Sequence, residues 1–282
     1  MNNFGGLLIN EFIKTFKKPR TFISFIALTI LVLALQYGFY HDGKEIMKFF
    51  TQSLEEDFSI NGNMLTSNFI TYLILQFLIV QMPLLVTLVS GDIISGEAQT
   101  GSLRYLLLRP QTRTQIYFAK WIISMFYTLL LLIWLGILAL VVSKFIFPNG
   151  DLIAAFSDGV HITRAADCNF KFLEAFGIAF LALGLITSFA MMLSAFAENS
   201  ISPIIIVMST VIIFTVIGTF ELPVFEFLKP FMFTTHMIVW RDLFENPVPA
   251  SEIITSCMVM FAHIILFFSI GLFHFNKKDI TC

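Results

Sequence analysis

Six stretches of the chain, each at least 20 residues long, contain no aspartate, glutamate, lysine or arginine, and this pattern is typical of an integral membrane protein. The stretches are residues 21–40, 58–91, 121–143, 175–197, 199–220 and 253–276. A helix rises about 1.5 Å per residue, so a run of about 20 apolar residues crosses a hydrocarbon core of about 30 Å. The 282 residues are 57% hydrophobic and 13% charged, which excludes an ordinary soluble enzyme.

The expected architecture is an all-α integral membrane protein with six transmembrane helices. We expect an N-terminal amphipathic interfacial helix over 1–20, a six-helix transmembrane domain over 21–276 and a cytoplasmic tail over 277–282. The spans are predicted at about 21–40, 68–91, 121–146, 174–197, 200–220 and 253–275. The second apolar run exceeds one crossing and begins with polar residues, so its helix is predicted from Asn68 or Phe69, with a kink at Pro83. A cleaved signal peptide, the alternative for the first span, lacks a small-residue cleavage site.

The segment before the first span has the periodicity of an amphipathic helix. At about 100° per residue, Phe4, Leu8, Phe12 and Phe16 with their apolar neighbours cover one half of a helical wheel, and polar residues cover the other. Leu7 does not fit this pattern. We expect the helix to lie along the cytoplasmic face of the bilayer, with its lysines near anionic headgroups. The alternative is a basic N-terminus that only sets orientation.

Basic residues are distributed unevenly between the two sides of the predicted membrane domain. An even number of spans places both termini, the 91–120 loop and the turn at residue 198 on one side. That side carries ten of the 17 basic and five of the 19 acidic residues. The positive-inside rule assigns the more basic side to the cytoplasm. We therefore expect a multi-pass protein of the cell inner (cytoplasmic) membrane, with both termini cytoplasmic and Cys168 outside.

The sequence lacks residues in patterns that would carry catalysis or ion transport. His263 is titratable and lies deep inside a predicted span, but a single histidine there is more often a hydrogen-bonding group than a proton carrier. Neither HExxH nor GxSxG occurs, and no GxxxxGK[ST] loop is present to bind nucleotide phosphates. The sequence thus predicts no enzyme, no metal site and no cofactor in this chain. Energy for any transport must then come from a partner.

The loop over residues 91–120 is both polar and patterned. Leu103, Leu106 and Leu107 follow the helical i, i+3, i+4 spacing, and Pro110 ends that helix. Glu97 lies near a helix start, where the helix dipole favours a carboxylate. These features predict a short amphipathic rod on the cytoplasmic side. The alternative is a basic loop that only sets the topology.

With these residues the loop resembles that of ABC-2 type permeases, the membrane subunits of ABC exporters. In that family an acidic residue, a Gly-Thr pair, a leucine-rich turn, a proline, a basic residue and a lysine recur. The matching positions here are Glu97, Gly101, Leu106, Leu107, Pro110, Arg113 and Lys120. Ser102 replaces the usual threonine and keeps its hydroxyl. The layout of six spans, an interfacial N-terminal helix and a proline-containing segment before the last span is similar to the family as well.

The resemblance implies that the chain is the membrane-spanning permease subunit of an ATP-binding cassette exporter. A separate ATPase subunit would bind ATP and Mg and would contact the loop over 96–110, the coupling helix. The coupling residues implied are Glu97, Gly101, Ser102, Arg104, Leu106, Leu107, Arg109, Pro110 and Arg113. The turn at Glu198 and Asn199 would make a second cytoplasmic contact. Two ATPase subunits and a second permease copy, identical or related, would complete the unit, among membrane lipids and without nucleic acid.

The segment between the fifth and sixth spans, residues 221–252, contains four prolines and many aromatic residues and is too interrupted to cross the membrane. By resemblance it forms an outer half-inserted hairpin and a gate. The gate candidates are Glu221, Pro223, Phe225 and Pro230. The alternative is an ordinary extracellular loop with aromatic residues at the interface.

Two other functions are compatible with the pattern. The chain could be a non-transporting membrane scaffold or mechanotransmitter that relays ATPase motion to an extracytoplasmic machine, and a periplasmic partner would then accompany it. A secondary transporter is less favoured, because the predicted spans contain no carboxylate at their centres.

Overall fold

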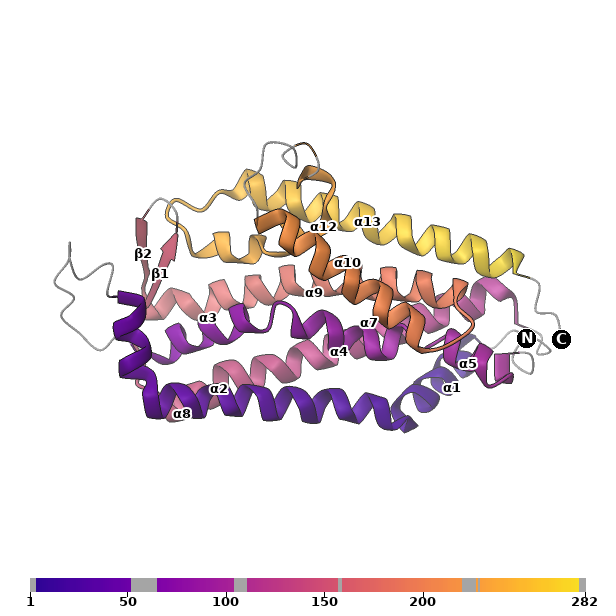
Figure 1. Cartoon of the computed structure of the whole chain (residues 1–282), viewed down its shortest axis with the longest axis horizontal. Coiled ribbons are helices and arrows are strands. Elements are labelled where there is room, and N and C mark those ends of the chain that lie inside the picture. The colour runs from indigo at the N-terminus through magenta and orange to yellow at the C-terminus, as the bar shows by residue number, and fades with distance from the viewer. Residues whose placement is uncertain are drawn as a thin grey trace.

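The computed structural model describes residues 4–51, 65–103, 111–156, 159–219, 227 and 229–278, which form an elongated bundle with its long helices along one axis (Figure 1). Within these residues, five helices are long and apolar enough to cross a membrane, and a bent helix pair brings the number to six if the pair counts as one span. The predicted fold class, an all-α multi-pass membrane protein, is therefore confirmed.

The spanning helices overlap the six apolar runs, and three of them extend well beyond the predicted limits. The helices are α2 (Pro19–Thr51), the pair α3 (Ser67–Phe77) and α4 (Gln81–Ser90), α7 (Arg113–Gly136) with its continuation, α9 (Ala165–Phe196), α10 (Ile201–Thr219) and α13 (Ala250–Lys277). Within α2 the part that is apolar enough to span is Pro19–Gly43.

The bent pair α3 and α4 forms an angle of 56°. Thr66 caps the start of α3, where its Oγ1 accepts a hydrogen bond of 3.2 Å from the Phe69 backbone N–H. Pro83 lies in the first turn of α4, where the N–H that proline lacks is not required by the helix. The break therefore lies at residues 78–80, just ahead of the proline that was expected to mark the kink.

The third span changes its helical geometry near the end. After α7 it continues through a π-helix, η1 (Ile137–Val142), into α8 (Ser143–Ile146). Gln36 of α2 donates a hydrogen bond of 2.9 Å to the Leu138 carbonyl, and Thr71 of α3 donates one of 2.7 Å to the Ala139 carbonyl. Two neighbouring helices thus satisfy backbone groups of the irregular segment at Leu138 and Ala139, which are both buried.

The helix α9 lies at the centre of the packing. It contacts α4, α7, α10 and α13. Hydroxyl groups join it to α7, because Thr128 and Thr187 share a hydrogen bond of 2.8 Å and the Trp121 indole donates one of 3.0 Å to Ser188. Such bonds between membrane helices are worth about 0.6 kcal/mol each on average, so apolar packing dominates this core.

A two-stranded antiparallel hairpin lies at one end of the bundle (Figure 1). Its strands are β1 (Leu152–Phe156) and β2 (Gly159–Thr163), paired from Leu152 opposite Thr163 to Phe156 opposite Gly159. The sequence pattern predicts no strands there. We call this end of the bundle the hairpin end.

The segment before α13 folds back into the bundle. It contains the 3₁₀ turns η2 (Lys229–Phe231) and η3 (Val239–Phe244) and the short helix α12 (Phe233–Met237). Phe233, Trp240 and Phe244 are buried in the core formed with α9 and α13. Residues 229–244 therefore pack against α9 and α13, and the half-inserted outer hairpin expected by resemblance stays a prediction.

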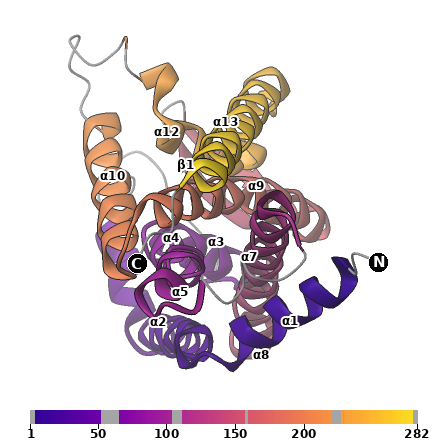
Figure 2. The same ribbon diagram turned by 90° about the vertical axis from the view of Figure 1, so that its right-hand side faces the viewer.

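The opposite end, which we call the loop end, gathers α1 (Phe4–Lys17), α5 (Ser95–Gln99) and the last turn of α13. Figure 2 looks onto this end and shows α1 lying obliquely across the bundle next to α7. Leu7, Tyr117 and Phe275 share one apolar cluster there. The first and last described helices therefore meet at the same end, as an even number of crossings requires.

Candidate functional site

The helix α1 turns a narrow stripe of side chains toward the bundle. Leu7, Glu11 and Thr15, spaced four residues apart, are buried. Ile9, Phe12 and Ile13 are exposed, as an interfacial helix requires. Leu7, the residue that does not fit the amphipathic pattern, is the residue that anchors the helix, and Glu11 faces the protein and not the headgroups.

Glu11 meets a lysine that has no exposed surface. The Lys120 ammonium lies 2.6 Å from Glu11 Oε2 and 2.8 Å from Glu97 Oε1, and the Lys120 side chain is 0% exposed. It also donates a hydrogen bond of 3.3 Å to the Ile93 carbonyl. Lys14 bridges the same two carboxylates, at 3.0 Å from Glu11 and 3.1 Å from Glu97. Three segments distant in sequence, α1, α5 and α7, are thus joined through two carboxylates and two ammonium groups.

A second ion-paired group lies beside the first. The Asp92 carboxylate accepts from Lys18 at 2.8 Å and from Arg20 at 2.7 Å, which links the 91–95 turn to the α1–α2 junction. Gly96 makes room for it, because a Cβ at this position would collide with the Asp92 carboxylate. We call the seven residues of both groups the loop-end charge cluster. They are Glu11, Lys14, Lys18, Arg20, Asp92, Glu97 and Lys120.

The cluster keeps the Glu97 carboxylate ionised. Burial alone would raise the pKa of Glu97, but the neighbouring ammonium groups of Lys120 and Lys14 outweigh it and hold that pKa below its usual value. The Glu97 Oε2 atom is buried and has no hydrogen-bond partner within the described part of the chain. A carboxylate with a lowered pKa is ionised at neutral pH, so Glu97 is a fixed charge and not a proton donor.

The helix α5 is also fixed to α9 and to the turn between α9 and α10. The Ser194 hydroxyl accepts hydrogen bonds from the backbone N–H groups of Ile94 and Ser95, at 3.2 and 2.9 Å. At the other end of α5, Gln99 Oε1 accepts from the Ser200 backbone N–H at 3.2 Å and from its hydroxyl at 3.0 Å. The two segments predicted as cytoplasmic contacts, the loop and the 198–200 turn, therefore adjoin each other.

The end of α13 belongs to the same assembly. The Arg113 guanidinium donates to the backbone carbonyls of Asn276 at 3.0 Å and Lys278 at 2.7 Å, which lie at the last turn of that helix. The Lys278 ammonium donates to the Ala195 carbonyl at the end of α9, at 2.9 Å. Arg113 thus contacts this chain's own backbone.

The remaining predicted coupling residues divide into two groups. Gly101 ends α5 with φ of 71°, a conformation that favours glycine, and Ser102 lies within 3.0 Å of the Thr100 hydroxyl. Leu103 is buried in the apolar cluster of the loop end. The residues outside the described part of the chain are Arg104, Leu106, Leu107, Arg109 and Pro110. The amphipathic rod therefore stays a prediction.

The second predicted contact is exposed. Glu198 and Asn199 lie on the surface, and the Asn199 side chain accepts from the backbone N–H groups of Ile201 and Ser202, so it caps α10. Of the outer gate candidates, Pro230 lies in η2, and its carbonyl is 3.1 Å from His236 Nε2. Glu221, Pro223 and Phe225 lie outside the described residues.

Sequence reasoning missed the roles of Glu11, Asp92 and Ser194. The poor fit of Leu7 was the one available signal, since Leu7 and Glu11 lie on the same stripe of α1. Asp92 and Ser194 carry no such signal, because hydroxyls and single carboxylates at span ends are common. Their partners are 72 and about 100 positions away in the chain.

The described residues of the loop end join segments that are distant in the sequence. Their charged groups are paired at close distance, and within the described residues no group of three His, Cys, Asp or Glu side chains could hold a metal ion. The arrangement makes α5 a rigid extension of α4 that is fixed to α1, α7 and α9. A force applied to the loop is therefore transmitted to several membrane helices at once.

Fold and site together define a multi-pass helical membrane protein with an interlocked loop end. The chain belongs to the family described as "Protein of unknown function (DUF2705)", whose model matches residues 26–281. A comparison with curated proteins finds no match.

Proposed function

We propose that this chain is the permease subunit of an ATP-binding cassette exporter and that a separate ATPase subunit drives it through the 96–110 loop. The single observation that supports this most is the burial of Lys120 between Glu11 and Glu97. This contact fixes the base of the proposed coupling element to two membrane-associated helices. A coupling element must be held in this way if it is to move the spans.

The loop and the 198–200 turn would form one contact surface for the ATPase. The hydrogen bonds between Gln99 and Ser200 hold these segments together, and Glu198 is exposed beside them. We propose that the loop end faces the cytoplasm, because the basic residues are concentrated there.

Motion of the loop would reach the spans by three connections. Lys120 leads to α7, Ser194 leads to α9, and the continuous chain through Asp92 leads to α4. Since the interior of a protein is close-packed, a displacement at this end shifts these helices together. ATP and Mg would be bound by the partner ATPase, and two copies of each subunit would form the working unit.

The test is co-purification of this chain with an ATP-binding cassette ATPase subunit from the same cells, combined with ATP hydrolysis in reconstituted membranes. The variants Arg104→Ala and Glu198→Ala should weaken ATPase association or uncouple hydrolysis from transport while the permease stays folded. Glu97→Gln should uncouple hydrolysis and also lower thermal stability, because it disturbs the buried cluster. The purified chain alone should neither bind nor hydrolyse ATP.

Arg164→Ala is the matched control, because Arg164 is exposed at the other end of α9, far from the loop. It should leave association, hydrolysis and stability unchanged. Wild-type association and hydrolysis in both Arg104→Ala and Glu198→Ala would contradict the proposed contact surface. If ATP hydrolysis responds to an extracytoplasmic partner and no cargo crosses the membrane, the result would support a mechanotransmitter instead.

A further inference from the structure

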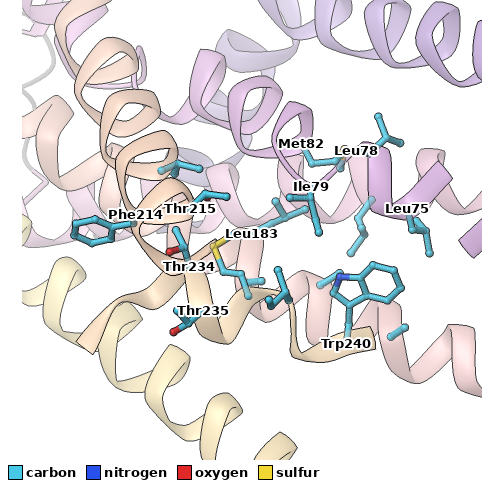
Figure 3. Close-up of a pocket in the computed structure, with 18 of the residues that line it drawn as sticks. Leu75, Leu78, Ile79, Met82, Leu183, Phe214, Thr215, Thr234, Thr235 and Trp240 are labelled. Carbon is cyan, nitrogen blue, oxygen red and sulfur yellow. The ribbon is translucent and has the colours of Figure 1, made fainter. Parts of the chain in front are cut away.

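A cavity of about 250 Å³ lies inside the bundle, away from the loop-end charge cluster (Figure 3). Its walls come from α3 and α4, α7, α9, α10 and the α12–η3 segment. Leu75, Leu78, Ile79 and Met82 line it from the two sides of the α3–α4 break, and Trp240 lines it from η3. The lining is thus largely apolar and comes from five separate parts of the chain.

The backbone and the small side chains around it explain why this space is open. The 56° bend between α3 and α4 interrupts the straight helix face that a neighbour could pack along, and α10 packs against α4 and α9. On α9 the lining positions Ala175, Ala179 and Ala182 carry single methyl groups. Close packing is the rule in protein interiors, so an unfilled space of this size is unfavourable.

The polar side-chain groups of the wall are threonine hydroxyls and the indole N–H of Trp240. Thr219 donates to the Thr215 carbonyl at 2.9 Å, and Thr235 donates to the Met232 carbonyl at 2.7 Å. Thr234 differs, because its Oγ1 atom is buried and has no hydrogen-bond partner among the described residues, while its side chain lines the cavity. Thr234 is 7% exposed, so bulk water does not satisfy this hydroxyl.

Water is a poor occupant here. A buried water needs two to four polar partners, and apolar cavities of about 150 Å³ stay dry and accept small hydrocarbons. At about 250 Å³ the cavity is below the usual range of about 300 to 1,000 Å³ for drug-sized ligands. Its size and chemistry fit a segment of hydrocarbon chain with one hydrogen-bonding group, and they do not fit a folded peptide.

We propose that this cavity binds a single aliphatic chain of an amphipathic molecule, with a polar group of that molecule hydrogen-bonded to the Thr234 hydroxyl. The lining residues Thr219 and Ile238, at the ends of α10 and α12, are exposed, so the cavity opens beside these helices. Ile212, Ile213 and Val216 on α10 are exposed apolar side chains. A chain can therefore enter from a hydrocarbon environment. The proposal concerns the chain by itself and holds whether or not an ATPase drives it.

The test uses the full chain in vesicles with two photoreactive probes. One probe is palmitic acid with a diazirine on its chain, and the other is a phosphatidylglycerol that carries the same acyl chain. Peptide mapping of the adducts should place them on α9, α10 and α12 lining residues. Labelling by the fatty acid alone identifies a free amphiphile as the source, and labelling by both identifies a bilayer lipid.

Cavity-filling variants supply the comparison. Ala179→Phe and Gly218→Leu should each reduce labelling of the lining residues by about tenfold. At Gly218 a Cβ meets only an ordinary 3.5 Å contact with Thr235 Cγ2, so this second variant is expected to fold if the first does not. Thr234→Val should reduce labelling by about two- to tenfold, because one hydrogen bond is lost.

Ala262→Phe is the control, since Ala262 is exposed on α13 and does not line the cavity. It should leave the labelling pattern unchanged. Adducts that spread evenly over the exposed faces of α2 and α13 and persist in both filling variants would overturn the proposal. Size-exclusion profiles matching the wild-type chain ensure that loss of labelling does not reflect unfolding.

Discussion

Replacing Lys120 by methionine should destabilise the loop end strongly. Lys120 and Glu11 are 0% and 1% exposed, so neither charge is screened by water. In the wild-type chain Glu11 and Glu97 face Lys14 and Lys120, whereas Lys120→Met leaves two buried carboxylates against Lys14 alone. Removing one partner of a buried ion pair costs about 3 to 5 kcal/mol, because the remaining charge stays buried.

The assay is thermal unfolding of the detergent-solubilised chain. For proteins toward the larger sizes, a loss of 1 kcal/mol lowers the Tm by about 2 °C, so Lys120→Met should lower the apparent Tm by about 6 to 10 °C. The double variant Glu11→Gln/Lys120→Met restores charge balance, since Lys14 then faces Glu97 alone. We expect it to recover at least half of the lost Tm.

Lys144→Met is the matched control, because Lys144 continues the same span and its ammonium makes only an exposed hydrogen bond to Asn169 at 2.6 Å. It should change the Tm by less than about 2 °C. The reasoning would be refuted by a Tm of Lys120→Met within that margin of the wild type. It would also be refuted by Tm losses that simply add in the double variant, since charge balance would then play no part.

Three further predictions concern other parts of the molecule. Burial and the nearby Glu245 raise the pKa of Asp242 to about 6, so the folded chain holds a proton that the unfolded chain releases between about pH 4 and 6. Protonation of Asp242 should therefore stabilise the folded chain at low pH, and this contribution should be lost as pH rises through about 6. The Tm of Asp242→Asn should lack this pH dependence. Gly101→Ala should cost about 1 kcal/mol, because alanine is strained at a φ of 71°, and the loop should then be cleaved faster by protease. For topology, Cys168 is fully buried and is therefore unsuited as a reporter; a cysteine introduced at exposed Val160 should react with an impermeant thiol reagent in intact cells, and one at Lys17 should not.

The sequence by itself determined that this protein is a helical membrane protein and where its apolar helical segments lie. Uncharged runs of about 20 residues leave few alternatives to membrane helices, because an unpaired backbone group in hydrocarbon is costly. The start of α3 near Asn68 and the bend near Pro83 also follow from local signals. These features depend on polar caps, prolines and apolar periodicity, which are short-range properties of the chain.

Only the tertiary structure decided which charges face inward. Glu11 looked like one of several polar residues on an interfacial helix, and Lys120 looked like a basic residue that sets topology, yet they form a buried pair across 109 positions. The π-helix of the third span and the cavity at the α3–α4 break likewise depend on side chains from three or more helices. Such contacts have no local signature, because the energy of a buried charge or an unfilled space is set by the neighbours that folding brings to it.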